Sequence, residues 1–224
     1  MAHGATQWLT RGLLAATLLA AAVGTSGCGW LAGAYEKTHG RQVLGEYKGL
    51  ANRSVAIVVY SREDLINEYP SANREISEFL KVELIKAVPT IRLVDPQVVI
   101  EWQNNTLGWD RMSEQEVAQH FGVERVIWIE LVEYRTKEKG IEGLVQGHID
   151  TNVRVVETGA VDPDSPVWRK DVGVEWPPDG PVDMMRVKET DVRRHTLELY
   201  GTTLANAFAD HKEFDPSMVE RRLP

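Results

Sequence analysis

The residues best suited to chemistry are His148 and Asp150, two positions apart, and Glu130 in a preceding hydrophobic stretch. Side chains two positions apart in a β-strand point to the same face, so an imidazole and carboxylates could meet on one side of a sheet. Such a set is typical of general acid–base catalysis or of a metal site. A sheet face in contact with water also needs polar side chains, and we favour this simpler interpretation. We therefore predict no catalytic residue, no bound cofactor and no metal.

No familiar catalytic motif accompanies these residues. The sequence contains no HExxH, no GxSxG and no glycine-rich phosphate-binding loop, and its six histidines are spread along the chain. A single cysteine, Cys28, excludes an intramolecular disulfide and a zinc site built on several cysteines. The sequence therefore predicts a non-enzymatic protein.

The position of Cys28 suggests a role for it. A short polar segment ends in Arg11, the apolar run Leu13–Val23 follows, and small residues lead to the cysteine, which is the order of a secretory signal peptide. The uncharged stretch from Gly12 to Gly27 is shorter than the roughly 20 residues that a spanning helix needs. A transmembrane anchor and an unmodified cysteine near an ordinary cleavage site are the two alternatives.

The segment Thr25-Ser26-Gly27-Cys28 resembles the lipobox of bacterial lipoproteins, with Thr25 where that family usually has Leu. The resemblance implies cleavage before Cys28, acylation of its thiol and attachment to a membrane through several acyl chains, which together anchor a protein stably. Gly29, rather than Asp, follows the cysteine, which is similar to the signal for outer-membrane sorting in this family. We expect the periplasmic side of a bacterial membrane, the outer membrane rather than the inner one.

The composition fits one domain behind this anchor. At 224 residues and 43% hydrophobic residues, the chain can bury a substantial core. Its formal net charge of -8 and its lack of a run rich in lysine and arginine argue against nucleic-acid binding. We predict a signal peptide at 1–27, the lipidated cysteine and a tether at 28–52, a domain at 53–212 and a polar tail at 213–224.

Hydrophobic periodicity predicts an α/β sandwich with a mixed sheet and helices mainly on one face. The β-branched run Arg53–Tyr60 is typical of a central strand buried on both sides. Residues 123–134, 144–157 and 168–176 predict a three-strand antiparallel meander with one dry and one wet face. A short strand is predicted at 90–94, and helices are predicted at 71–88, 95–102, 113–121 and 187–212.

The order of these segments resembles a known group of envelope domains. VAIVVY, IRLVD, HFGVERVIWIEL, DTNVRVVETG and VWRKD are similar to the periplasmic lipoprotein domain shared by CsgG and LpoB, and to the N-terminal domain of TolB. The resemblance covers most of residues 53–210. It implies the fold far more than an activity.

Two of the seven tryptophans are expected at the surface. Trp168 and Trp176 alternate in phase with valines and belong to the core, whereas Trp109 falls in a loop and Trp128 on the mixed apolar and polar face of its strand. Exposed tryptophans are common in interfaces. The predicted partner surface consists of Trp109, Trp128, His148 and Asp150.

The leading functional prediction is a binding or assembly module of the cell envelope. It would be attached to the membrane through its N-terminal lipid and would bind an envelope protein or further copies of itself. A subunit of a secretion or pore assembly is the alternative, followed by an envelope enzyme of unrecognised type.

Overall fold

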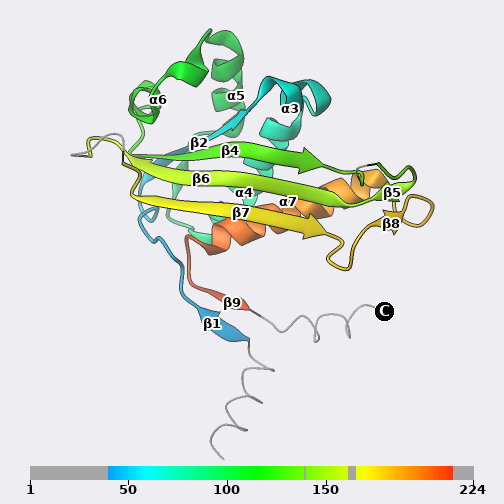
Figure 1. Cartoon of the computed structure of the whole chain (residues 1–224). Coiled ribbons are helices and arrows are strands. Elements are labelled where there is room, and N and C mark those ends of the chain that lie inside the picture. The colour runs from blue at the N-terminus through cyan, green and yellow to red at the C-terminus, as the bar shows by residue number, and fades with distance from the viewer. Residues whose placement is uncertain (1–39, 139, 161–164, 214–224) are drawn as a thin grey trace, which may run out of the picture. The chain divides into compact units, whose positions relative to one another are not determined.

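A computed structural model describes residues 40–138, 140–160 and 165–213 (Figure 1). Residues 44–211 form one compact unit. A second unit contains both ends of the chain, and its described part belongs to the pairing of β1 (Arg41–Val43) with β9 (His211–Glu213). Cys28, the predicted signal peptide and residues 214–224 of the predicted tail lie outside the described residues.

A five-stranded mixed sheet is the centre of the larger unit, with the strand order β3-β2-β4-β6-β7. β2 runs parallel to β3 and β4, whereas β4, β6 and β7 pair antiparallel in sequence order. The strands are β2 (Ser54–Ser61), β3 (Arg92–Leu93), β4 (Arg125–Arg135), β6 (Gly147–Glu157) and β7 (Trp168–Trp176), and a separate pair is formed by β5 (Leu144–Val145) and β8 (Val182–Asp183). The fold is therefore of the α/β class with a mixed sheet.

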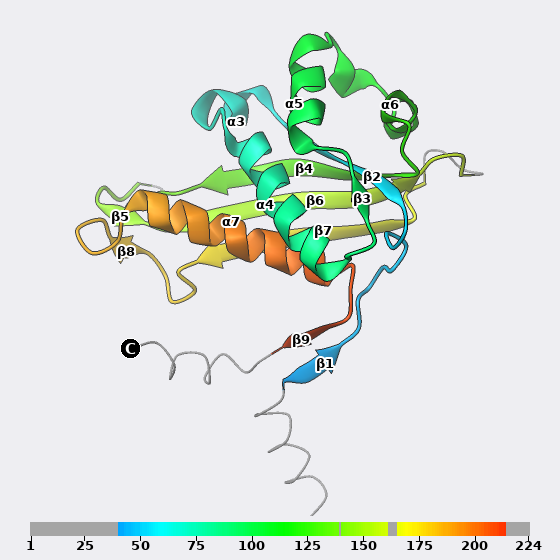
Figure 2. The ribbon, with the colours of Figure 1, turned by 180° about the vertical axis from the view of Figure 1, so that it is seen from behind.

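Helices pack on both faces of this sheet. They are α3 (Glu63–Glu68), α4 (Ala72–Ala87), α5 (Pro96–Asn105), the short 3-10 helix η1 (Trp109–Arg111), α6 (Glu114–Phe121) and α7 (Glu189–Asn206). Figure 2 shows α4 and α7 side by side across one face. No helix in the described ranges is both long and apolar enough to cross a membrane.

The larger core lies between the sheet and the pair α4 and α7. Alternate residues of β4, Ile127, Ile129 and Leu131, point into it and are at most 1% exposed. Leu80 of α4 and Tyr200 of α7 meet them from the helices. Burying each such side chain contributes about 1.5–3 kcal/mol, so this face anchors the sheet.

A second, smaller core covers the opposite face of β2 and β4. Ala56, Val58 and Trp128 of the sheet pack there against Val99 of α5 and Val117 of α6. Because both faces of β2 are buried, the run at 53–60 has the environment that its continuous apolar sequence predicts. The prediction of helices mainly on one face is incomplete, since this part of the sheet has cover on both faces.

The start and end of α6 follow local capping signals in the sequence. The Ser113 hydroxyl accepts a hydrogen bond from the backbone N–H of Glu116, and the Glu116 carboxylate accepts one from the N–H of Ser113 at 2.7 Å. Gly122 ends the helix with a left-handed φ of 61°. β4 begins soon after this cap, at Arg125.

The folded unit begins before the predicted boundary at residue 53. Leu50 is fully buried, and the Tyr47 ring packs against Trp168 and Phe208. The final helix, in turn, ends at Asn206 rather than at Lys212. Isolated apolar residues such as Tyr47 and Leu50 carry no periodicity, so the sequence offered no helix or strand signal for them.

Candidate functional site

A bulge in β4 decides which carboxylate lies beside His148. Leu131 faces Thr151 of β6, but the next pair is Glu133 with Asp150, so Val132 is skipped and exposed. A bulge sets two residues of one strand against one of its partner. Glu130, opposite Asn152, lies on the predicted face but outside the cluster, where Glu133 takes its place.

His148 is the centre of this cluster, and both of its ring nitrogens lie close to carboxylates. Nδ1 lies 2.9 Å from Glu175 Oε1, and Nε2 lies 2.8 Å from Asp150 Oδ2 and 3.6 Å from Glu133 Oε2. The His148 side chain is 13% exposed, whereas those of Asp150 and Glu175 are 43% and 49% exposed. The imidazole thus lies beneath a rim of carboxylates.

Arg135 contacts two of these carboxylates, Glu133 and Glu175, and also Glu138. Its Nε lies 3.3 Å from Glu133 Oε1 without hydrogen-bond geometry, and Nη1 donates to Glu138 Oε2 at 3.0 Å. Nη2 lies 3.8 Å from Glu175 Oε1. Counting Glu133, Glu138, Asp150 and Glu175, four carboxylates surround one guanidinium and one imidazole, so negative charge is in excess.

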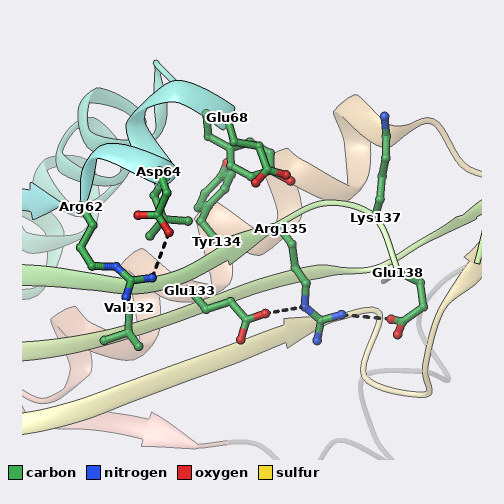
Figure 3. Close-up of a pocket in the computed structure, with 11 residues that line it drawn as sticks. Arg62, Asp64, Glu68, Val132, Glu133, Tyr134, Arg135, Lys137 and Glu138 are labelled. Carbon is green, nitrogen blue, oxygen red and sulfur yellow. Dashed lines mark hydrogen bonds and ion pairs between the residues drawn. The ribbon is translucent and has the colours of Figure 1, made fainter. Parts of the chain in front are cut away.

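A pocket of about 450 Å³ lies next to the cluster, after the C-terminal ends of β2 and β4. Figure 3 shows Glu133 and Arg135 on its wall, opposite Arg62 and Asp64, which pair at 3.1 Å. Burial raises the pKa of Tyr134 to about 12, so this phenol lines the pocket in its neutral form. The pocket is therefore lined by charged side chains together with apolar ones such as Leu65 and Val132.

The two predicted surface tryptophans do not lie with His148 and Asp150. Trp128 is 4% exposed, which contradicts the predicted exposure, because α5, η1 and α6 cover this part of the face. Its ring lies 6.0 Å from the ring of Trp109, which is partly buried in the same core. The Arg154 guanidinium lies 5.4 Å from the centre of the Trp128 ring. It also donates to Glu114 of α6 at 2.7 Å, so a contact between the sheet and α6 lies over the Trp128 ring.

Glu133 and Arg135 were not among the predicted site residues, because strict alternation assigns the wrong face to every β4 residue after the bulge. Glu175 had a usable signal, since it belongs to the polar face of the alternating segment 168–176. Within the described part of the chain, the residues that could hold a metal ion together are Glu133, His148 and Asp150, whose ligand atoms lie within 4.8 Å of one another.

No protein-family model and no curated protein matches the sequence. Several solved structures are similar. The PelC dodecamer from Paraburkholderia phytofirmans is 12% identical, with a TM-score of 0.43 over 74% of this chain and 95% of that chain. Lipoprotein GNA1162 from Neisseria meningitidis is 14% identical, with a TM-score of 0.39 over 65% of this chain and 96% of that chain.

Protein XCC0632 from Xanthomonas campestris is 7% identical, with a TM-score of 0.45 over 74% of this chain and 90% of that chain. Identities and TM-scores of this size transfer neither an activity nor an assembly state. The resemblance to the CsgG, LpoB and TolB group stays a prediction.

Proposed function

We propose that the protein is a lipid-anchored module of the bacterial cell envelope that binds another envelope protein without catalysing a reaction. The observation that carries this proposal is the uneven cover of one sheet face. In the described part of the chain, α5 and α6 pack over β2 and the first half of β4, while Asn152, Asp171 and Glu175 of β6 and β7 are exposed. We call the surface formed by Glu133, His148, Asp150, Asn152, Asp171 and Glu175 the open face.

The open face suits a polar partner. The charged side chains around His148 are already held in place, since His148, Arg135 and their carboxylates contact one another across three strands. Held side chains lose little conformational freedom on binding, which favours affinity. The open face adjoins β7, which ends the strand order and contains no proline, so a partner strand could also add there.

Photo-crosslinking in native envelopes tests this surface. A photo-reactive residue at Asp171 of the open face should form adducts, and mass spectrometry should identify the partner. The matched control is Val82 on α4, which is 49% exposed and lies on the opposite side of the sheet. Adducts at Val82 alone, or at neither position, would contradict the proposed surface.

The anchor is tested separately at Cys28. The full chain with Cys28→Ala should leave the membrane fraction or remain unprocessed, because the only thiol available for acylation is gone. The control variant, Ser26→Ala, keeps the cysteine and should be found in the same membrane fraction as the parent. An unchanged distribution and migration of the Cys28→Ala variant would show that the anchor assignment is wrong.

The alternative, a subunit of a secretion or pore assembly, gives a different crosslinking result. Adducts at Asp171 would then join copies of this chain, and the purified lipidated protein would conduct ions in planar bilayers. An adaptor would give adducts with another protein and no conductance.

A further inference from the structure

Both ring nitrogens of His148 lie within hydrogen-bond distance of a carboxylate oxygen. A carboxylate oxygen only accepts hydrogen bonds, and each nitrogen of a neutral imidazole either donates or accepts. Nε2 lies 2.8 Å from Asp150 Oδ2, and Nδ1 lies 2.9 Å from Glu175 Oε1. A neutral imidazole satisfies one of these contacts, so the second needs either another proton or a metal ion.

We propose that Glu133, His148 and Asp150 bind a divalent transition-metal ion such as Zn²⁺. Histidine nitrogen and carboxylate oxygen are ordinary zinc ligands, and a tetrahedral ion at about 2.0–2.2 Å from each ligand separates them by about 3.3 Å. The Nε2 atom lies 2.8 Å from Asp150 Oδ2 and 3.6 Å from Glu133 Oε2. These two separations bracket the required value, and all three ligand atoms lie within 4.8 Å of one another, so side-chain rotations would admit the ion.

Neighbouring groups hold these ligands in the orientation that a metal needs. In metal sites, the second nitrogen of a ligating histidine commonly donates to a carboxylate, which fixes the tautomer. Glu175 occupies this position at Nδ1. Arg135 contacts Oε1 of Glu133 and leaves Oε2 directed at His148. With one hydrogen on Nδ1, the Nε2 lone pair faces the two ligand carboxylates.

Gly173 provides the space for Asp150. The two residues face each other in the pairing of β6 with β7, and a Cβ added at Gly173 would lie 2.4 Å from Asp150 Oδ1. Glycine inside a strand weakens the strand and often marks a close approach of another group. The missing side chain thus allows the carboxylate to lie flat beside His148.

The proposed site would keep one coordination position toward solvent. Three protein ligands leave the fourth position of a tetrahedral ion to water or to an incoming group. The Asp150 and Glu133 side chains are 43% and 31% exposed, so this position opens on the surface. The inference does not depend on the lipid anchor or on a protein partner.

Calorimetric titration of the full-length chain with Zn²⁺ alone tests the site. The protein is purified in detergent and stripped of metal with a chelator. We expect one ion per chain, and His148→Asn or Asp150→Asn should weaken binding at least tenfold. Glu175→Gln and Gly173→Ala, which change only the support of the ligands, should weaken it about tenfold, as outer-shell changes typically do.

His195→Asn is the matched control. His195 also pairs with a carboxylate, Glu198, at 3.2 Å, but on α7 and away from the proposed site. This variant should bind Zn²⁺ like the parent. Circular dichroism without metal shows whether each variant is folded. If His148→Asn is unfolded, Asp150→Asn still tests the site, because it preserves the size of the side chain.

Three outcomes would overturn the proposal. They are the absence of Zn²⁺ binding to the parent at micromolar concentration, equal loss in the His195→Asn control, and unchanged binding in folded Asp150→Asn. The first outcome would mean that His148 and Asp150 form a polar contact without a metal ion. None of the three bears on crosslinking at Asp171, so the partner surface can fail or hold independently.

Discussion

One face of the central sheet contains two regions with opposite environments. Under α5, η1 and α6, Trp128 is buried in an apolar core, whereas farther along the face His148 and Asp150 lie at the surface. Both regions come from strands whose side chains alternate in the same way. Alternation therefore determines which residues share a face, but the helices that pack there determine whether that face is core or surface.

Truncation of Trp128 should give the largest effect. Trp128→Ala removes a large ring from the packed region and should lower the free energy of unfolding by about 3–5 kcal/mol. Asn152→Ala, the matched change on the open face, should alter it by less than about 0.5 kcal/mol. Chemical denaturation measures both, and similar losses would mean that the open face is covered as well.

A truncation on the other face of β4 tests whether lost burial destabilises the fold even where no aromatic ring is removed. Ile129 is fully buried between the sheet and the helices α4 and α7. Ile129→Ala should cost about 2–5 kcal/mol, because it leaves a cavity that the neighbours fill only in part. Val132→Ala, at the exposed bulge residue, is the control and should be near neutral.

The start of β4 offers a carboxylate with the opposite electrostatic balance to the open face. A hydrogen bond from the Ser54 backbone and the Arg53 guanidinium lower the pKa of Glu124 from 4.5 to about 2. Arg92 also donates to it at 3.1 Å. Here cations surround one carboxylate, whereas carboxylates surround His148.

This difference predicts a distinct acid response. A carboxyl group whose pKa is lowered in the folded state stabilises the fold above its ordinary pKa and loses that contribution as pH falls. The stability of the parent should therefore drop between about pH 4.5 and 2 partly through Glu124. Glu124→Gln should be less stable at pH 7 and show a shallower decline over that range in pH-dependent denaturation. A decline of unchanged slope would contradict this assignment.

In metal-free protein, His148→Ala should cost less than the core truncations Trp128→Ala and Ile129→Ala. The side chain contributes polar contacts rather than apolar burial, so its removal should cost about 0.5–1.5 kcal/mol in the presence of chelator. Thermal unfolding with and without Zn²⁺ sharpens the comparison, because only the parent should gain stability from the ion. A loss as large as that of Ile129→Ala would place His148 with the core instead.

Much of the fold could be predicted because its signals are local. The continuous apolar run at 53–60 indicates a strand buried on both sides, and Ser113, Glu116 and Gly122 mark the ends of α6. The positions of Tyr47 and Leu50 in the core could not be predicted, because single apolar residues give no period and their partners are distant in sequence.

The candidate site was predictable only in part. His148 and Asp150 were identified because they lie on one strand, and the alternation of side chains holds within it. Glu133 was missed because a bulge depends on how two strands pair, which the sequence of one strand does not record. Trp128 was assigned to the surface because nothing in its own strand shows that α5 and α6 would pack over it.

The sequence by itself determined the α/β class, the order of the main helices and strands, the alternation of faces within an uninterrupted strand and the caps that start and end α6, because each depends on neighbours a few residues apart. The short helix α3 and the pairing of β5 with β8 were not predicted. Only the tertiary structure decided which faces are covered and which carboxylates lie around His148. Those outcomes depend on the docking of α5 and α6 and on the pairing of β4, β6 and β7, where residues far apart in the chain meet.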